Sequence, residues 1–341
     1  RAPHGPGPHP HPHGKAPTMR AVRITAHGGP DALTVQDIPT PRRTPGTVLV
    51  QVRAATVNPV DLANLAGKVT SAVHRPASPL PRTAGRDYAG VVTDGPDHLR
   101  GLEVWGTSGG LAVTHDGAQA DYLLVPEDTV RPKPASLTFA EAAAVGLTHT
   151  VAWLALVDRI DLHAGETLLV TGASGAVARA ATDIAHWHGA TVIAADRRPA
   201  DDLTADVTID TTTHDLTQAV LRATDGTGVD AVLDTVGGPL LDPALTTLRP
   251  GGRAAVIASA LTPTATVDVL DFYRNDRTLH GVNTLNLPLA KAADILDILR
   301  RGFDTGALTP PRTTTFPLDE ASAAYQAVVD GTPGTKIVLT P

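Results

Sequence analysis

One segment of the 341-residue chain constrains its fold more than any other. Residues 167–170 form a short apolar run that breaks into the sequence GASGAVA at residues 172–178. A helical pattern follows to about His188, and a second β-rich run at residues 191–195 ends in Asp196. The order is strand, glycine turn, helix, strand and acid, which predicts a βαβ unit in a parallel sheet.

The residues of this turn favour binding of a dinucleotide. Gly172 permits a tight turn, and Gly175 lets the backbone approach a pyrophosphate, which the N–H groups at the start of the following helix attract. Asp196 stands where such a unit places the acid that binds a ribose hydroxyl. The pattern is G-x-x-G-x-x-A rather than G-x-G-x-x-G, and an ordinary strand-to-helix turn is the alternative. The two strands, the helix and the acid together predict dinucleotide binding.

Composition excludes several classes of function. The net charge of −7 gives the whole chain no electrostatic footprint for nucleic acid. The chain has no cysteine, so disulfides, cysteine-ligated zinc and a thiol nucleophile are excluded. No run approaches the length of a membrane span and no export signal is visible, so we expect no membrane partner and a cytoplasmic location.

The organisation of the chain predicts two domains of an α/β protein. Residues 1–18 are rich in Pro, Gly and His and are expected to be a disordered leader or tag. Residues 19–138 alternate short β-like runs with turns and predict a mainly β domain, which residues 302–341 are expected to rejoin. Residues 139–301 alternate helical and β stretches and predict a doubly wound parallel sheet.

Nine motifs follow one another along the chain. They are NPVD at 58–61, GRDYAG at 85–90, EVWG at 103–106, residues 118–125, residues 142–148, the glycine turn, DTVGG at 234–238, RPGGR at 249–253 and TKIVL at 335–339. Their order resembles the medium-chain dehydrogenase/reductase superfamily, in its zinc-independent quinone oxidoreductase and enoyl reductase branch. The resemblance runs from Met19 to the C-terminus. It implies a Rossmann dinucleotide-binding domain, a GroES-like catalytic domain and a nicotinamide cofactor.

The resemblance implies chemistry without zinc. The zinc-dependent branch has Gly-His-Glu where this chain has Gly85-Arg86-Asp87, and it has a catalytic cysteine. Without a Lewis acid, conjugate reduction fits best: hydride from NAD(P)H goes to an activated C=C bond of an enone or enoyl thioester, or to a quinone. The expected substrate is small and apolar. The alternatives are a carbonyl reductase or redox-neutral enzyme on the same scaffold, and a non-catalytic nucleotide-binding protein.

The candidate catalytic residues are Asn58 and Asp61, which by resemblance line the cleft beside the nicotinamide. The alternative is that Asn58 makes a turn and Asp61 caps the next helix. Asp87 is expected to be structural. His149, beside Thr148, is either a proton donor near neutral pH or, as we expect, a core histidine.

The candidate cofactor-binding residues come from the cleft, the glycine turn and the strand ends, because ligands of such sheets bind outside the carboxyl ends of the strands. They are Asn58, Thr148, Gly172, Ser174, Gly175, Ala176, Val177, Asp196, Arg197, Arg198, Thr235, Val236, Ala258, Ser259, Gly281, Val282 and Asn283.

Two further expectations concern the choice of cofactor and self-association. Asp196 favours NAD(H), whereas Arg197 and Arg198 can hold a 2′-phosphate; with the branch more often using NADPH, NADP(H) is preferred by a small margin. Residues 279–285 alternate in hydrophobicity and predict a strand that extends the sheet into a homodimer. A buried edge strand within one subunit is the alternative.

Overall fold

The computed structural model describes residues 17–69, 77–258, 263–331 and 334–341. The expected leader therefore lies outside the described residues except for Pro17 and Thr18, and Thr18 already begins the first strand. The candidate cofactor residue Ser259 also lies outside the described residues.

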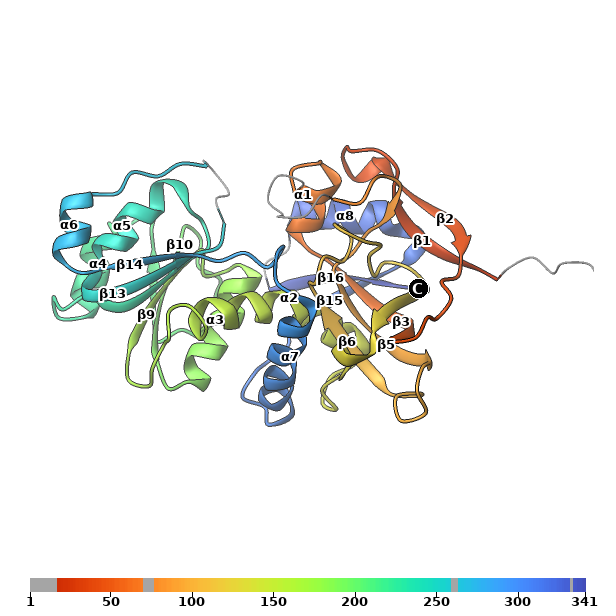
Figure 1. The fold of residues 1–341 in the computed structure, drawn as a ribbon. Helices are drawn as coiled ribbons and strands as arrows, with labels where there is room; N and C mark the ends of the chain where they lie inside the picture. Colours follow the sequence, from red (N-terminus) through yellow and green to blue (C-terminus); the bar gives the residue numbers. More distant parts are fainter. Residues whose placement is uncertain (1–16, 70–76, 259–262, 332–333) are drawn as a thin grey trace, which may run out of the picture.

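A six-stranded parallel sheet forms one half of the molecule, which confirms the predicted fold class (Figure 1). The strand order is β11-β10-β9-β12-β13-β14, the arrangement typical of dinucleotide-binding domains. The strands are β9 (Thr167–Thr171), β10 (Thr191–Asp196), β11 (Val207–Asp210), β12 (Val229–Asp234), β13 (Leu248–Val256) and β14 (Thr278–Gly281). The predicted strand at 279–285 therefore ends at Gly281, and the residues after it form a loop.

The sheet is buried on both faces because successive residues of its strands enter different cores. In β9, Leu168 and Val170 pack with α2 (Phe139–Leu156) and α3 (Ala176–Trp187). Leu169 between them packs with α4 (Leu216–Ala223) and α5 (Leu241–Thr246) on the other face.

The mainly β half holds two sheets and receives the end of the chain. Its first sheet has the order β2-β1-β4, and its second the order β15-β16-β3-β5-β6-β8, with β7 paired to β3. The C-terminal strand β16 lies between β15 and β3, so the last residues return to this half. The strands are β1 (Thr18–Ile24), β2 (Leu33–Pro39), β3 (Thr47–Val57), β4 (Arg82–Thr83), β5 (Asp87–Asp94), β6 (Glu103–Thr107), β7 (Tyr122–Pro126), β8 (Arg131–Pro132), β15 (Arg312–Pro317) and β16 (Thr335–Thr340).

The remaining helices complete the two halves. Helices α1 (Pro59–Leu65) and α8 (Ala321–Asp330) lie in the mainly β half, and α6 (Val269–Arg274) precedes β14. Helix α7 (Leu289–Asp304) packs on α2, β6 and β8. The domain boundary expected between residues 301 and 302 falls inside α7.

Helix α2 joins the two halves and corrects one expectation. It packs against α3 on one side and against β3, β5 and β6 on the other. Among the described residues, α2 is the one helix long and apolar enough to cross a membrane by length and composition, so a run of that length does exist. However, 83% of it is buried inside the protein, where its apolar surface forms part of the core. Thr138 and Glu141 fix its start as a capping box.

Candidate functional site

The glycine turn after β9 is built around a position that only glycine can occupy. Gly172 has a φ of +65°, and a Cβ atom there would lie 2.5 Å from Thr235 Oγ1 and 2.8 Å from Val236 Cγ2. Thr235 in turn donates its hydroxyl to the carbonyl of Thr171 over 2.7 Å. The end of β12 is thereby held against the turn, so the predicted residues Thr235 and Val236 do lie beside Gly172.

The start of α3 presents unsatisfied N–H groups. Gly175 is the N-cap and supplies no side chain to cap the helix, and the first turn contains no acidic residue. The N–H groups of Ala176, Val177 and Ala178 have no carbonyl one turn earlier to bond to. A Cβ on Gly175 would meet only the carbonyl oxygen of Gly172, at 3.1 Å. This backbone cradle fits the pyrophosphate of a dinucleotide.

The end of β10 is tied to the turn through Asp196. Its carboxylate accepts hydrogen bonds from the N–H groups of Ser174, at 2.9 Å, and Arg198, at 3.2 Å. The hydroxyl of Ser174 donates to the carbonyl of Arg198 over 3.2 Å. The side chains of Arg197 and Arg198 are exposed and have no partner within the described part of the chain. The structure therefore brings Ser174, Asp196 and the arginine pair together.

The other predicted strand-end residues lie at the same edge of the sheet. Ala258 follows β13, Gly281 ends β14, and Val282 and Asn283 follow it. Ala258, Gly281 and Asn283 are exposed, whereas Val282 is buried. Parallel strands bring their carboxyl ends to one edge, so these residues lie at the same edge of the sheet as the turn at Gly172, two and three strands away from it.

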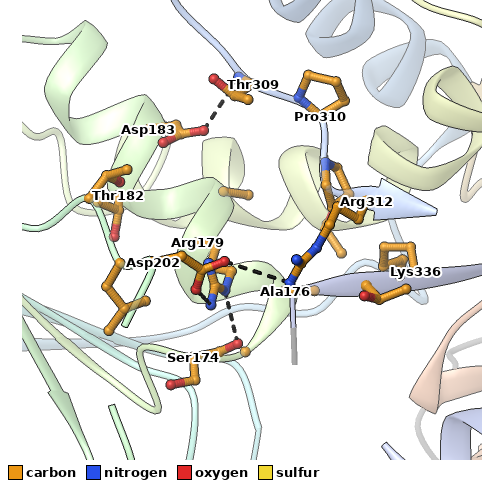
Figure 2. Close-up of a pocket in the computed structure, with 18 of the residues that line it drawn as sticks. Ser174, Ala176, Arg179, Thr182, Asp183, Asp202, Thr309, Pro310, Arg312 and Lys336 are labelled. Carbon is orange, nitrogen blue, oxygen red and sulfur yellow. Dashed lines mark hydrogen bonds and ion pairs between the residues drawn. The ribbon is translucent and has the colours of Figure 1, made fainter. Parts of the chain in front are cut away.

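A cavity of about 740 Å³ lies beside the glycine turn and between the two halves (Figure 2). Four of the predicted residues line it: Thr148, Ser174, Gly175 and Ala176. The other predicted residues that the structure describes do not line it: Asn58, Gly172, Val177, Asp196, Arg197, Arg198 and those at the ends of β12, β13 and β14. Its remaining wall comes from α3, from the loop after β10 and from the ends of β15 and β16. Residues that the sequence reasoning missed line it: Arg179, Asp183, Asp202, Arg312, Asp330 and Lys336.

A buried polar network extends from this cavity into the mainly β half. Lys336, which is 5% exposed, donates from Nζ to Asn58 Oδ1 over 2.5 Å. The amide nitrogen of Asn58 donates to Asp87 Oδ2 over 2.7 Å. Both ends of the Asn58 amide are therefore bound inside the protein. The role of Asp87 in this network is structural, while ligand contact by Asn58 stays a prediction.

Asp61 is a helix cap, which is the alternative to its assignment as a catalytic residue; the catalytic role stays a prediction. It is 1% exposed, does not line the cavity, and its Oδ2 accepts the backbone N–H of Asn58 over 2.8 Å. Together with Asn58 it forms the capping box of α1. Burial raises the pKa of Asp61 to about 7, and the neighbouring carboxylate of Asp87 adds to the rise against the opposing charges of Arg86 and Lys336.

His149 is a buried residue of α2 that also lines the cavity. Burial lowers its pKa to about 3. Its Nδ1 lies 3.2 Å from the carbonyl of Val145, so the Nδ1–H donates there and Nε2 is the acceptor. Within the described residues Nε2 has no partner. The lowered pKa and the burial of the ring support the expected core histidine over a proton donor.

The described residues contain no group of three His, Asp or Glu side chains that could hold a metal ion. That finding does not test the expectation of zinc independence, which stays a prediction. Arg86, at the position of the zinc-binding histidine, is buried and donates to the carbonyl of Thr284 over 3.0 Å.

Comparisons with known proteins agree with this architecture. Family models described as "Alcohol dehydrogenase GroES-like domain" and "Zinc-binding dehydrogenase" match residues 44–135 and 176–299. The chain is 35% identical to the "Zinc-type alcohol dehydrogenase-like protein C337.11" of Schizosaccharomyces pombe, over 94% of this chain and 97% of that protein. It is 27% identical to the quinone oxidoreductase of Sus scrofa, over 94% and 98%. The crystal structure of an alcohol dehydrogenase superfamily protein from Novosphingobium aromaticivorans superposes with a TM-score of 0.84 at 30% identity, covering 95% of this chain and all of that one.

The raised pKa of Asp61 predicts a specific dependence of stability on pH. Between pH 3.8, the ordinary pKa, and about 7, the native side chain keeps a proton that the unfolded chain has released. Stability therefore falls as pH rises through this window, by about 1.4 kcal/mol per pH unit, and Asp61 contributes no further change above pH 7. Asp61→Asn removes this titration, so its urea-unfolding midpoint should fall less than that of the wild type between pH 5 and 7. Asp37→Asn, at an exposed position, is the matched control and should follow the wild type; parallel curves for all three proteins would contradict the assignment.

Proposed function

Because the chain belongs to the medium-chain dehydrogenase/reductase superfamily, in its quinone oxidoreductase and enoyl reductase branch, and is an NAD(P)H-dependent oxidoreductase, we propose that its acceptor is an activated C=C bond or a quinone. The uncapped start of α3 on the wall of the cavity between the two halves supports the nucleotide site, and the similarity to a quinone oxidoreductase supports the acceptor. The enone or enoyl thioester is expected to be small and apolar, and the catalysis is expected to need no zinc.

Different residues of the chain are expected to have different roles in this reaction. When bound, the reduced nicotinamide supplies the hydride. The N–H groups of Ala176 and Val177 would hold the pyrophosphate, and Gly172 keeps the turn close enough to β12 to leave them free. Thr148 and Lys336 also line the cavity. The Nζ of Lys336 is a hydrogen-bond donor, as the oxygen of an accepting carbonyl requires while negative charge develops on it.

If the proposed function is correct, a variant that loses nucleotide binding should also lose turnover. The wild type should oxidise NADPH with an enone or quinone present, and a chelator should leave that rate unchanged. Gly175→Asp places a carboxylate where the pyrophosphate approaches, so nucleotide binding and turnover should both be lost while the circular dichroism spectrum is retained.

Two of the alternatives have their own outcomes in these assays. Nucleotide binding without turnover on enones, quinones or acyl thioesters would favour a non-catalytic nucleotide-binding protein. An alcohol product would favour carbonyl reduction. Unchanged nucleotide affinity in Gly175→Asp would refute the position of the site, and loss of activity with removal of stoichiometric zinc would refute zinc independence.

We propose NADP(H) as the preferred cofactor. The exposed side chains of Arg197 and Arg198 are available to a 2′-phosphate, while both oxygens of Asp196 already accept backbone N–H groups. Arg197→Ala/Arg198→Ala should therefore weaken NADPH binding by roughly tenfold or more and change NADH binding little. Titration of both nucleotides against this variant and against Asp196→Ala decides the point. Equal losses for NADH and NADPH in the arginine variant would contradict a 2′-phosphate site.

We also propose a homodimer in the cytoplasm. Within the described residues β14 is an edge strand, and Leu279 on it is 36% exposed. The neighbouring helix α6 exposes Val269 and Tyr273 to 70% and 59%. An open edge beside exposed apolar side chains is typical of a surface that pairs with another chain. Sedimentation velocity should give twice the mass of the chain, and Leu279→Asp should give a monomer; a monomeric wild type would refute the proposal.

A further inference from the structure

Three charged side chains meet at the edge of the cavity beside the glycine turn (Figure 2). Arg179 lies on α3, Asp202 in the loop after β10, and Arg312 at the start of β15 in the other half of the molecule. Asp202 Oδ1 lies 2.6 Å from Arg179 Nη2, and its Oδ2 lies 3.8 Å from Arg312 Nη2. One carboxylate thus lies between two guanidinium groups from different halves.

The two arginines lie close to each other as well as to Asp202. A Cβ atom on Gly334 would be 3.5 Å from Arg179 Cζ and 3.5 Å from Arg312 Nη2. Two like charges this near repel unless an anion lies between them. In the described structure Asp202 supplies that anion, and the hydrogen bond from Arg179 is the main reason why its pKa is lowered.

Arg179 is also attached to the glycine turn itself. Its Nε donates to the carbonyl of Ser174 over 3.2 Å, and its side chain is only 21% exposed. Its guanidinium is therefore held beside the uncapped start of α3. By contrast, the side chain of Asp202 is 56% exposed and lies on a turn, so it can move away without disturbing the core.

The position of Asp202 affects the electrostatic field in the cavity, because other charged side chains line the same wall. The lining residues include three cations, Arg179, Arg312 and Lys336, and three acids, Asp183, Asp202 and Asp330. While Asp202 stays in place these formal charges cancel. If Asp202 leaves, the guanidinium groups of Arg179 and Arg312 have no carboxylate between them and lie near the start of α3, which is an arrangement that attracts a phosphate.

We propose that Arg179 and Arg312 form a binding site for a phosphate group of the nucleotide, and that Asp202 occupies this site as an internal counter-ion until the phosphate displaces it. The proposal rests on the proposed function. It adds that Asp202 weakens nucleotide binding, and that its displacement breaks the contact with Arg312 between the two halves. The phosphate is either the pyrophosphate or the 2′-phosphate, which share this chemistry.

Asp202→Asn tests the counter-ion because the two possible roles of Asp202 predict different changes in nucleotide affinity. These roles are a competitor of the phosphate and a link between the two halves. If Asp202 competes with the phosphate, the variant should bind nucleotide about two- to fivefold more tightly, the range that an exposed ion pair supports. Arg179→Gln should bind about tenfold more weakly, and Arg312→Gln, at a side chain 74% exposed, should show a smaller loss. In the double variant Arg179→Gln/Asp202→Asn, the increase in nucleotide affinity caused by Asp202→Asn should be smaller than in the presence of Arg179.

Fluorescence titrations of NADH and NADPH against each variant show which phosphate group of the nucleotide binds at this site. Equal changes for both nucleotides identify the pyrophosphate, and changes confined to NADPH identify the 2′-phosphate. The matched controls are Asp94→Asn and Arg100→Gln, an exposed pair at 3.3 Å that does not line the cavity, and neither should change affinity.

Two further results separate the possible failures. If Asp202→Asn leaves nucleotide affinity unchanged or weakens it while the wild type binds, Asp202 only links the two halves and the counter-ion proposal is overturned. If the wild type binds neither nucleotide, the proposed function itself fails and this inference fails with it. Thermal unfolding of each variant shows whether a loss of affinity reflects a loss of folded protein.

Discussion

The close approach of Gly172 to the end of β12 is the contact on which the rest of the site depends. With no side chain at Gly172, Thr235 can hydrogen-bond to the last residue of β9, and the chain can turn directly into α3. The helix therefore begins at the edge of the sheet, with its first N–H groups unsatisfied and facing the cavity. Any side chain at Gly172 would separate β9 from β12 and move the start of α3.

The second constraint is the burial of charge next to this cavity. Lys336, Asn58 and Asp87 form a hydrogen-bonded chain, and Arg86 and Asp61 are buried with them. Removing one partner of such a group leaves an uncompensated charge, which typically costs about 3–5 kcal/mol. The network joins β16 to the start of α1 and to β5, so it fixes the wall of the cavity as well as the fold.

The sequence predicted the sheet and the glycine turn because both follow from local patterns. Strand residues 167–171 and the helix from 176 carry their periods and their turn within one short segment. The grouping of Arg179, Arg312 and Lys336 was not predictable in this way, because they come from distant segments and meet only after the halves pack. Asp61 was assigned to catalysis because its motif suits a cleft and a helix cap equally well, and only burial decides between them. The two interpretations of His149 were likewise not separable from the sequence, because its pKa depends on the packing around α2.

We propose that the nucleotide held at α3 gives its hydride to a conjugated C=C bond. Turnover of NADPH deuterated at the transferable position of the nicotinamide, with an α,β-unsaturated ketone as acceptor, tests this directly when the product is analysed by NMR. The account predicts a saturated ketone with deuterium at the β-carbon. Deuterium at the carbonyl carbon of an allylic alcohol would contradict it, as would a saturated ketone without deuterium.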